Sequence, residues 1–425
     1  MSSEQKYVQL HALSSDRIGR GFPLWLNAQR RGLLEDFLLS GIPDTKEERY
    51  RYTDISAILG RELRLTEPGS GSTTGLYREG TLVFNNGGFY GDEPLTVEDN
   101  GVVTGSLRAA SVDFEELVRK YYNSVAANKS DAMAALNSAF MYDGAFVYVP
   151  AGVDAGKIAI DFWYDSYGPD ELIFSRMLVV LEEGASCRVA VRYRGAGSKQ
   201  NVVSHLSEVV VAGGAKLLFS EVSDFGAENT AISAGYSSVA GEGVFDRVFI
   251  GLGGEMVHTE YHCDLTGRQA RSALYGLYLA GGEERMDTYT ATNHLVGDCS
   301  SYQLIKGVVS GSSEGAFTGR IYVAPDADGT SAEQQSRNMT LTPTSRVVAA
   351  PQLEIYAEDV KCSHGASVGR LDEEAVYYMR QRGIDEANAR RLQMSGFVND
   401  IISRCEDDAL AASVYEMASG KIENF

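Results

Sequence analysis

The sequence predicts a mainly β protein in which a β-solenoid core lies between an N-terminal and a C-terminal helical region. After Asp143 the chain consists of short apolar segments, such as KIAIDFWYD and MVHTEYHCD, that are separated by Gly, Asp or Asn. No helical period interrupts them over roughly 200 residues. A sandwich or a barrel would suit such strands as well. The solenoid is favoured because LYGLYLAG and QLIKGVVSG look like variants of one unit recurring at roughly 20 to 30 residues.

The N-terminal region, residues 1–140, is expected to be mixed and largely helical. Apolar residues recur at helical spacing over residues 22–40, which predicts an amphipathic helix. A second helical stretch covers residues 113–140 and is expected to break near residues 128–131. Between the two stretches, the Gly- and Ser-rich residues 67–75 indicate a flexible loop.

The solenoid is expected to cover residues 141–365 and to be followed by a C-terminal helical region, residues 366–425. Asp385 is placed as the N-cap of an amphipathic helix in this region. Its apolar stripe consists of Met394, Phe397, Val398, Ile401, Ile402 and Cys405. Such a face must be covered, and we expect the terminal helical pair to cap the end of the solenoid or to bind a partner.

Composition and charge narrow the classes of function. The chain of 425 residues carries a net charge of -20, which disfavours binding to nucleic acid and to anionic lipid. Its first residues have no basic start followed by an apolar core, and no apolar run approaches the ~20 residues of a transmembrane helix. The five cysteines are scattered and odd in number, which suits a reducing compartment. We therefore expect a cytoplasmic protein.

Cys362 and His364 form the first candidate site. If the strand LEIYAEDVKCSH is extended, residues two apart share a face, so these two side chains lie about 7 Å apart along the backbone. Thiolate and imidazole are both iron ligands. An iron-sulfur cluster takes four protein ligands, however, and the sequence has no CxxC motif to supply the others. The pair is therefore either an incomplete site that a second chain completes, or a buried cysteine beside a hydrogen-bonded histidine.

The segment VHTEYHC contains a second candidate site. His258, Glu260 and His262 alternate and therefore share one strand face, and His294 could join them across coils. Two histidines and a carboxylate can bind a metal ion. The order does not fit the HExxH zinc motif, which needs a helix. A polar ladder without metal is the competing interpretation.

Motifs for nucleotide or acyl chemistry are missing. The glycine-rich residues 67–75 have no Lys after the last glycine, so they do not form a P-loop. GLGGEM lacks the final glycine of a dinucleotide-binding loop, and no GxSxG motif occurs. The residues therefore show no nucleotide site in this chain.

The segment PQLEIYAEDVKCSHGASVGRLDEEAVYYMRQRGI, residues 351–384, closely resembles the C-terminal signature of SufD proteins, which belong to the SufB/SufD family. The segments AQRRGLLEDFLLSGIPDTKEERYRYTD and ALNSAFMYDGAFVYVP are also similar to that family. The resemblance implies a right-handed parallel β-helix and a non-catalytic scaffold subunit of the SufBCD iron-sulfur cluster assembly complex. In KCSHG, His364 matches the family histidine implicated in building a nascent cluster at the interface with SufB.

The resemblance also implies partners. The β-helix would pair with a SufB-like paralogue, and the C-terminal helices would dock a SufC-like ABC-type ATPase. The iron-sulfur cluster would be transient and shared with SufB, with His364 and Cys362 as interfacial ligands. Whether the isolated chain forms a homodimer stays open.

Two other classes of function remain as alternatives. One is a carbohydrate-active β-helix enzyme, although only two tryptophans are available for a sugar-binding groove. The other is a self-contained metalloprotein that uses His258, His262 and His294.

Overall fold

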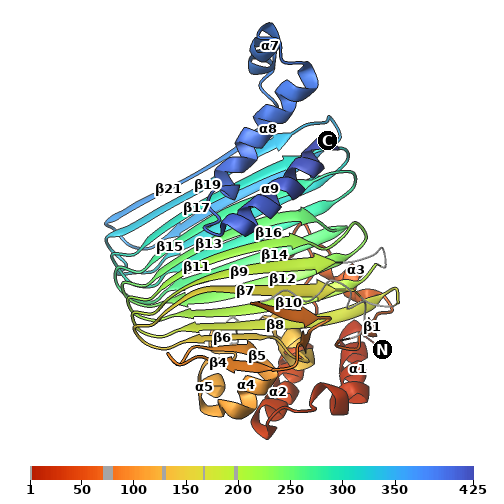
Figure 1. Cartoon of the computed structure of the whole chain (residues 1–425), viewed down its shortest axis with the longest axis vertical. Coiled ribbons are helices and arrows are strands. Elements are labelled where there is room, and N and C mark those ends of the chain that lie inside the picture. The colour runs from red at the N-terminus through yellow and green to blue at the C-terminus, as the bar shows by residue number, and fades with distance from the viewer. Residues whose placement is uncertain (1, 70–79, 127–130, 166–167, 196–199) are drawn as a thin grey trace.

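The chain folds into a parallel β-solenoid of about seven turns, flanked by helices at both ends of the sequence (Figure 1). The computed structural model describes residues 2–69, 80–126, 131–165, 168–195 and 200–425. Two sheets of eleven and ten strands enclose a lumen, and each coil contributes one strand to each sheet. The mainly β solenoid predicted from the Gly-punctuated apolar segments is confirmed.

The strands alternate between the two sheets along the chain. The first sheet contains β1 (Arg64–Leu65), β4 (Leu95–Val97), β5 (Val103–Ser106), β6 (Ala145–Val149), β8 (Glu171–Leu181), β10 (Val202–Val211), β12 (Thr230–Val239), β14 (Met256–Leu265), β16 (Arg285–His294), β18 (Glu314–Val323) and β20 (Arg346–Ile355). The second contains β2 (Thr81–Asn85), β3 (Gly88–Tyr90), β7 (Asp154–Tyr164), β9 (Ser186–Gly195), β11 (Lys216–Asp224), β13 (Val244–Gly253), β15 (Arg271–Ala280), β17 (Ser300–Val309), β19 (Thr330–Thr340) and β21 (Val360–Gly369).

From β6 onward the strands of each sheet pair in parallel and in register, apart from one shift near the start of β7 and one near the end of β11. Leu172, Val202, Thr230 and Met256, for example, lie side by side on four successive coils. One coil therefore takes about 30 residues, at the upper end of the repeat length predicted from the sequence.

Alternate residues of each strand point into the lumen, because successive side chains of a strand face opposite sides. The lumen near the N-terminal coils is filled by stacked aromatic rings. Phe162 stacks on Phe84 and Tyr193, with ring centroids 5.1 and 5.5 Å apart. These rings belong to a continuous buried cluster that extends to Phe317 on β18.

The N-terminal helices cover the outer face of the first sheet. They are α1 (Ser3–Ile18), α2 (Leu24–Ser40), η1 (Glu48–Tyr50), α3 (Ile55–Gly60), α4 (Leu107–Asp113), α5 (Glu115–Tyr121) and α6 (Ala132–Phe140). Phe37 and Phe140 pack with Phe174 of β8 and Ile232 of β12. The helix predicted over residues 22–40 is confirmed by α2.

The N-terminal region also contains the short strands β1 to β5, and β2 pairs directly with β7. These strands extend both sheets beyond the first complete coil. The loop predicted at residues 67–75 lies outside the described residues from residue 70 onward. The break predicted near 128–131 also lies outside them, except for residue 131.

The C-terminal region contains three helices, α7 (Glu373–Gln381), α8 (Glu386–Ile402) and α9 (Asp408–Glu423). The predicted pair corresponds to α7 and α8, with Asp385 as the N-cap of α8. The predicted end cap is wrong. Val398 and Val414 pack instead on the outward-facing Leu277 and Val308, along the side of the second sheet, because that face is apolar there. Cys405 is buried in the same cluster but lies just after the end of α8.

The last coil ends in two edge strands. Within the described part of the chain, β20 pairs only with β18, and β21 only with β19. Figure 1 shows α7 projecting away from the solenoid beside this end. No described helix has the length and apolar content to span a membrane.

Candidate functional site

Cys362 and His364 both lie on β21, at the open end of the solenoid. The predicted strand LEIYAEDVKCSH is not continuous, because β20 ends at Ile355 and β21 begins at Val360. The pair is nevertheless extended within β21, so Cys362 and His364 share one face, as predicted. Because the coil turns between the two strands, the pair belongs to the second sheet.

The shared face of Cys362 and His364 is the one that continues the lumen. Cys362 pairs with Ala332 and packs against the buried cluster that contains Ala332 and the lumen-facing Ile321. His364 pairs with Gln334, which is fully buried in the lumen. Since no further coil follows, this face of β21 is left at the mouth of the lumen.

The two side chains differ in exposure and protonation. His364 is exposed, whereas Cys362 is half-buried. Burial raises the pKa of the Cys362 thiol, so the thiol is neutral at physiological pH. Cys362 must therefore lose its proton before it can bind iron, whereas the exposed imidazole needs only a free ring nitrogen.

The second candidate site is a buried network of charges on the outer face of the first sheet. The imidazole of His258 donates from Nδ1 to Asp287 at 3.0 Å and from Nε2 to Glu260 at 3.1 Å. The other oxygen of Glu260 accepts from His262 Nε2 at 2.8 Å. The ring of Tyr50 covers His258 at 4.9 Å. Every polar atom of the His258 ring is thus hydrogen-bonded to a carboxylate.

The N-terminal segment around η1 completes this network. Arg49 forms an ion pair with Glu260 at 3.3 Å and a second one with Asp131. Thr53 donates to Asp287 Oδ2 at 2.7 Å. The segment also reaches the last coil, where Glu48 accepts a hydrogen bond from Gln352 of β20. It therefore spans several coils.

The protonation states of the network follow from these contacts. Burial alone would lower the pKa of His258, but Asp287 and Glu260 outweigh it and raise that pKa to about 9. Burial would raise the pKa of Glu260, but Arg49 and the two imidazoles hold it well below its usual range. At neutral pH the network is therefore a closed set of ion pairs.

His294 does not join this network. His258 and His262 face outward, whereas His294 pairs with Leu265 on the lumen-facing row and hydrogen-bonds Ser301 at 2.8 Å. No group of three or more metal-capable side chains is found among the residues that the structure describes. The self-contained metalloprotein using His258, His262 and His294 is therefore wrong, because the sheet separates its ligands.

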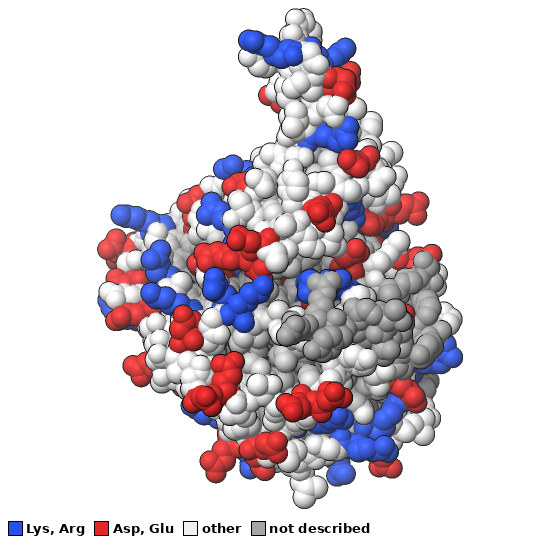
Figure 2. Space-filling view, in the orientation of Figure 1, with Lys and Arg blue, Asp and Glu red and all other residues white. Residues whose placement is uncertain are grey.

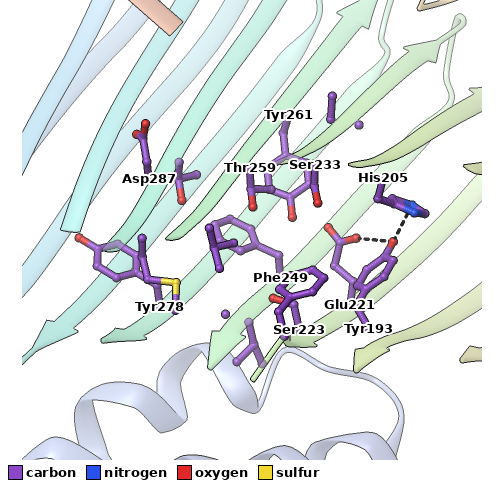
Figure 3. A pocket seen from close by; sticks show the side chains of 18 of the residues that line it. Tyr193, His205, Glu221, Ser223, Ser233, Phe249, Thr259, Tyr261, Tyr278 and Asp287 are labelled. Atoms are coloured by element: carbon purple, nitrogen blue, oxygen red, sulfur yellow. Dashed lines mark hydrogen bonds between the residues drawn. The ribbon is translucent and has the colours of Figure 1, made fainter. Parts of the chain in front are cut away.

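The lumen itself contains a polar stretch around a small cavity of about 40 Å³ (Figure 3). His205 accepts at Nδ1 from Ser175 at 2.8 Å and contacts the hydroxyl of Tyr193 at 3.2 Å, and Tyr193 donates to Glu221 at 3.5 Å. Burial lowers the pKa of His205 to about 3, so the ring is neutral. A cavity of this size has room for a few waters.

The C-terminal helices present an exposed aromatic surface. Tyr377 and Tyr378 on α7 are 62% and 59% exposed, and Leu392 on α8 is 53% exposed. The guanidinium of Arg382 lies over the Tyr378 ring, with 5.2 Å to the centroid. Figure 2 shows basic side chains at the tip of the projection that α7 forms. Nothing else in the described part of the chain covers these side chains.

Sequence reasoning did not identify Arg49, Asp287 or Gln334. The charged segment TKEERYRYTD was visible, but its partners lie on coils whose register the sequence does not reveal. Gln334 could have been found only as a member of a polar row that faces the lumen. Recognising that row requires knowing which face of each strand turns inward, which the sequence does not reveal.

Comparisons with known proteins cover nearly the whole chain. Residues 1–67 and 76–159 match the family described as the SufBD protein N-terminal region. Residues 163–397 match the SufBD core domain of the SUF system of FeS cluster assembly.

Three individual relatives share between 27% and 35% of their aligned residues with this chain. The iron-sulfur cluster assembly protein SufD of Escherichia coli is 35% identical over 170 residues, 40% of either chain. A SufBD family protein of Mycobacterium leprae is 28% identical over 247 residues, 56% of this chain and 62% of the relative. A SufBD family protein of Synechocystis is 27% identical over 334 residues, 76% of this chain and 69% of the relative. The match to the first two spans less than two thirds of their own length.

Proposed function

The chain belongs to the SufB/SufD family of iron-sulfur cluster assembly proteins, and on that premise we propose that it is a non-catalytic scaffold subunit of a cluster assembly complex. The observation that carries this proposal is the open end of the solenoid, where an exposed histidine lies on an edge strand that, among the described residues, pairs with only one neighbour. The family membership leaves the carbohydrate-active alternative without support.

The open end is the proposed pairing surface for a SufB-like paralogue. The free edges of β20 and β21 present unpaired backbone N–H and C=O groups, which favour pairing with another chain. Ile355 and Val368, both exposed, add apolar surface at the same end. A second solenoid with a matching end would cover both, and a second copy of this chain would do so in the isolated protein.

His364 and Cys362 would contribute to a nascent cluster at that interface, with the cluster as cargo rather than resident cofactor. Two ligands are too few for an iron-sulfur cluster, so the paralogue must supply the others. The exposed His364 is the first ligand in this proposal, and Cys362 joins it after losing its proton.

The ATPase would dock on α7 and α8. Tyr377, Tyr378 and Leu392 form an exposed aromatic and aliphatic surface of the kind enriched in interfaces. The chain has no P-loop, so nucleotide hydrolysis would come from the ATPase. Dimerisation of the ATPase would shift the bound helices and open the interface between the two solenoids. Such a complex is expected to work in the cytoplasm.

Co-expression of this chain with the SufB-like and SufC-like proteins of the same organism tests the proposal. Co-elution as one complex is expected, with His364→Ala reducing the iron and sulfide content of the complex after reconstitution. Ser363→Ala, on the opposite face of β21, is the matched control. Separate elution would overturn the scaffold role, and unchanged cluster content in the His364→Ala complex would overturn the role of the histidine.

A further inference from the structure

Gln334 lies directly behind His364 in the lumen. His364 of β21 pairs in register with Gln334 of β19, and Gln334 pairs in turn with Gln303 through their side chains, with Gln334 Nε2 donating to Gln303 Oε1 at 2.9 Å. All three belong to the lumen-facing rows of the second sheet. They form one column of polar side chains that ends at the mouth.

The column is anchored at its inner end. Gln303 Oε1 also accepts from Thr290 at 3.0 Å, and Gln303 Nε2 donates to Thr292 at 2.7 Å. Both polar atoms of the Gln303 amide, Oε1 and Nε2, are thus held by the first sheet. Because Gln303 Oε1 can only accept hydrogen bonds, the NH2 group of the Gln334 amide must face it.

Packing also holds Gln334 in place. Its side chain packs against Gly319, where an added Cβ would come within 2.4 Å of Gln334 Nε2 and 2.8 Å of Gln334 Cδ. Only glycine leaves this space at position 319. The hydrogen bond to Gln303 Oε1 directs the NH2 group of the Gln334 amide inward, so its oxygen is left for another partner.

Gln334 Oε1 is buried and has no hydrogen-bond partner among the described residues. A buried acceptor without a donor is costly, typically about 1–3 kcal/mol, so such an atom marks a place where a donor is expected. The next side chain outward in the same row is the imidazole of His364, which carries an N–H donor in either tautomer. Lys361 and Ser363 lie on the opposite face of β21, and the same-row neighbour Cys362 pairs with Ala332 instead.

We propose that Gln334 is the positioning residue of His364: its amide oxygen accepts the N–H of one ring nitrogen and leaves the other nitrogen, with its lone pair, directed at the open end. This inference rests on the proposed function, in which His364 is a ligand at the interface. When the ring nitrogen that does not bind the metal donates a hydrogen bond to a neighbouring acceptor, this bond selects the tautomer of the ligand histidine and raises the basicity of the other nitrogen.

The test uses the isolated full chain labelled with ¹⁵N-histidine. The chain has six histidines, so the signals of His364 are assigned by their loss in His364→Gln. In the wild type, one dominant tautomer with an N–H protected from exchange is expected. Gln334→Leu should turn this into a rapidly exchanging mixture of both tautomers, because the acceptor oxygen is lost, whereas Gln334→Glu keeps an acceptor oxygen and should retain one dominant tautomer.

Gln335→Leu is the matched control, since Gln335 is the next residue on β19 and faces outward, where it bonds Glu333. Unchanged His364 signals in Gln334→Leu, or equal changes in Gln335→Leu, would overturn the proposal. If Gln334→Leu does not fold, a freely exchanging His364 in the wild type overturns it as well. None of these results depends on cluster assembly, which is tested separately by His364→Ala in the complex.

Discussion

Arg49 and Glu260 form an ion pair of 3.3 Å although 211 residues separate them in the chain. Arg49 belongs to the short helix η1, and Glu260 lies in the middle of the solenoid on β14. Because Glu260 also holds His258 and His262, this one contact fastens the N-terminal segment to a buried network of charges. Glu48, the residue before Arg49, also accepts a hydrogen bond from Gln352 of β20 on the last coil.

Removing the arginine should destabilise the protein. Arg49→Ala leaves the buried carboxylate of Asp131 without its cation and removes one of the cations beside Glu260, and breaking a buried ion pair costs about 3–5 kcal/mol. Because Arg49 is partly exposed, we expect the loss to lie at the lower end of this range. The free energy of unfolding measured in urea should fall by about 3 kcal/mol. The exposed Arg51→Ala is the control and should change the free energy of unfolding by less than about 0.5 kcal/mol. Similar small losses in both variants would contradict the role of the network.

Stability should fall on the alkaline side because of His258. Its pKa is about 9 in the folded protein and about 6.5 when unfolded, so its contribution is complete below pH 6.5 and is lost as pH rises through 9. The loss over this window amounts to about 3 kcal/mol. His258→Gln should be less stable at pH 6.5 but show a flatter dependence between pH 6.5 and 9. Parallel curves for the two proteins would show that His258 is not charged in the folded state.

A charge placed at the mouth of the lumen should block pairing with the SufB-like paralogue. Ala366 lies on the same face of β21 as His364 and is exposed, so Ala366→Arg should leave the melting temperature unchanged. Its long charged side chain cannot be buried against an apolar partner without cost. We expect at least a tenfold weaker affinity by calorimetry. Ser363→Arg, on the outward face of the same strand, is the control, and equal weakening by both variants would locate pairing elsewhere.

Truncating the exposed aromatic surface of α7 should weaken binding of the ATPase. Tyr378→Ala removes a side chain that makes few contacts within its own chain, so the folded state should keep its stability. Interface tyrosines often contribute 2 kcal/mol or more, which is about thirtyfold in affinity. Tyr415→Ala, an exposed tyrosine on α9, is the comparison. Retention of the ATPase by Tyr378→Ala at wild-type affinity would place the docking surface elsewhere.

The sequence by itself determined the coils and the local chemistry of β21. Apolar segments separated by glycine turns predicted the solenoid because strand alternation and turn residues are local properties. The spacing of Cys362 and His364 predicted a shared face for the same reason, since side chains two apart on a strand point the same way. The resemblance near residues 351–384 added the family, which the comparisons confirm.

Only the tertiary structure decided which residues meet between coils. Register places His294 on the lumen side and His258 on the outer side of the same sheet, and a shift of one residue would have reversed either of them. The partner of Arg49 and the side on which α8 packs depend on surfaces built from coils far apart in sequence. The position of Gln334 behind His364 likewise follows from stacking one coil on another, because inter-strand register is a long-range property that no local pattern encodes.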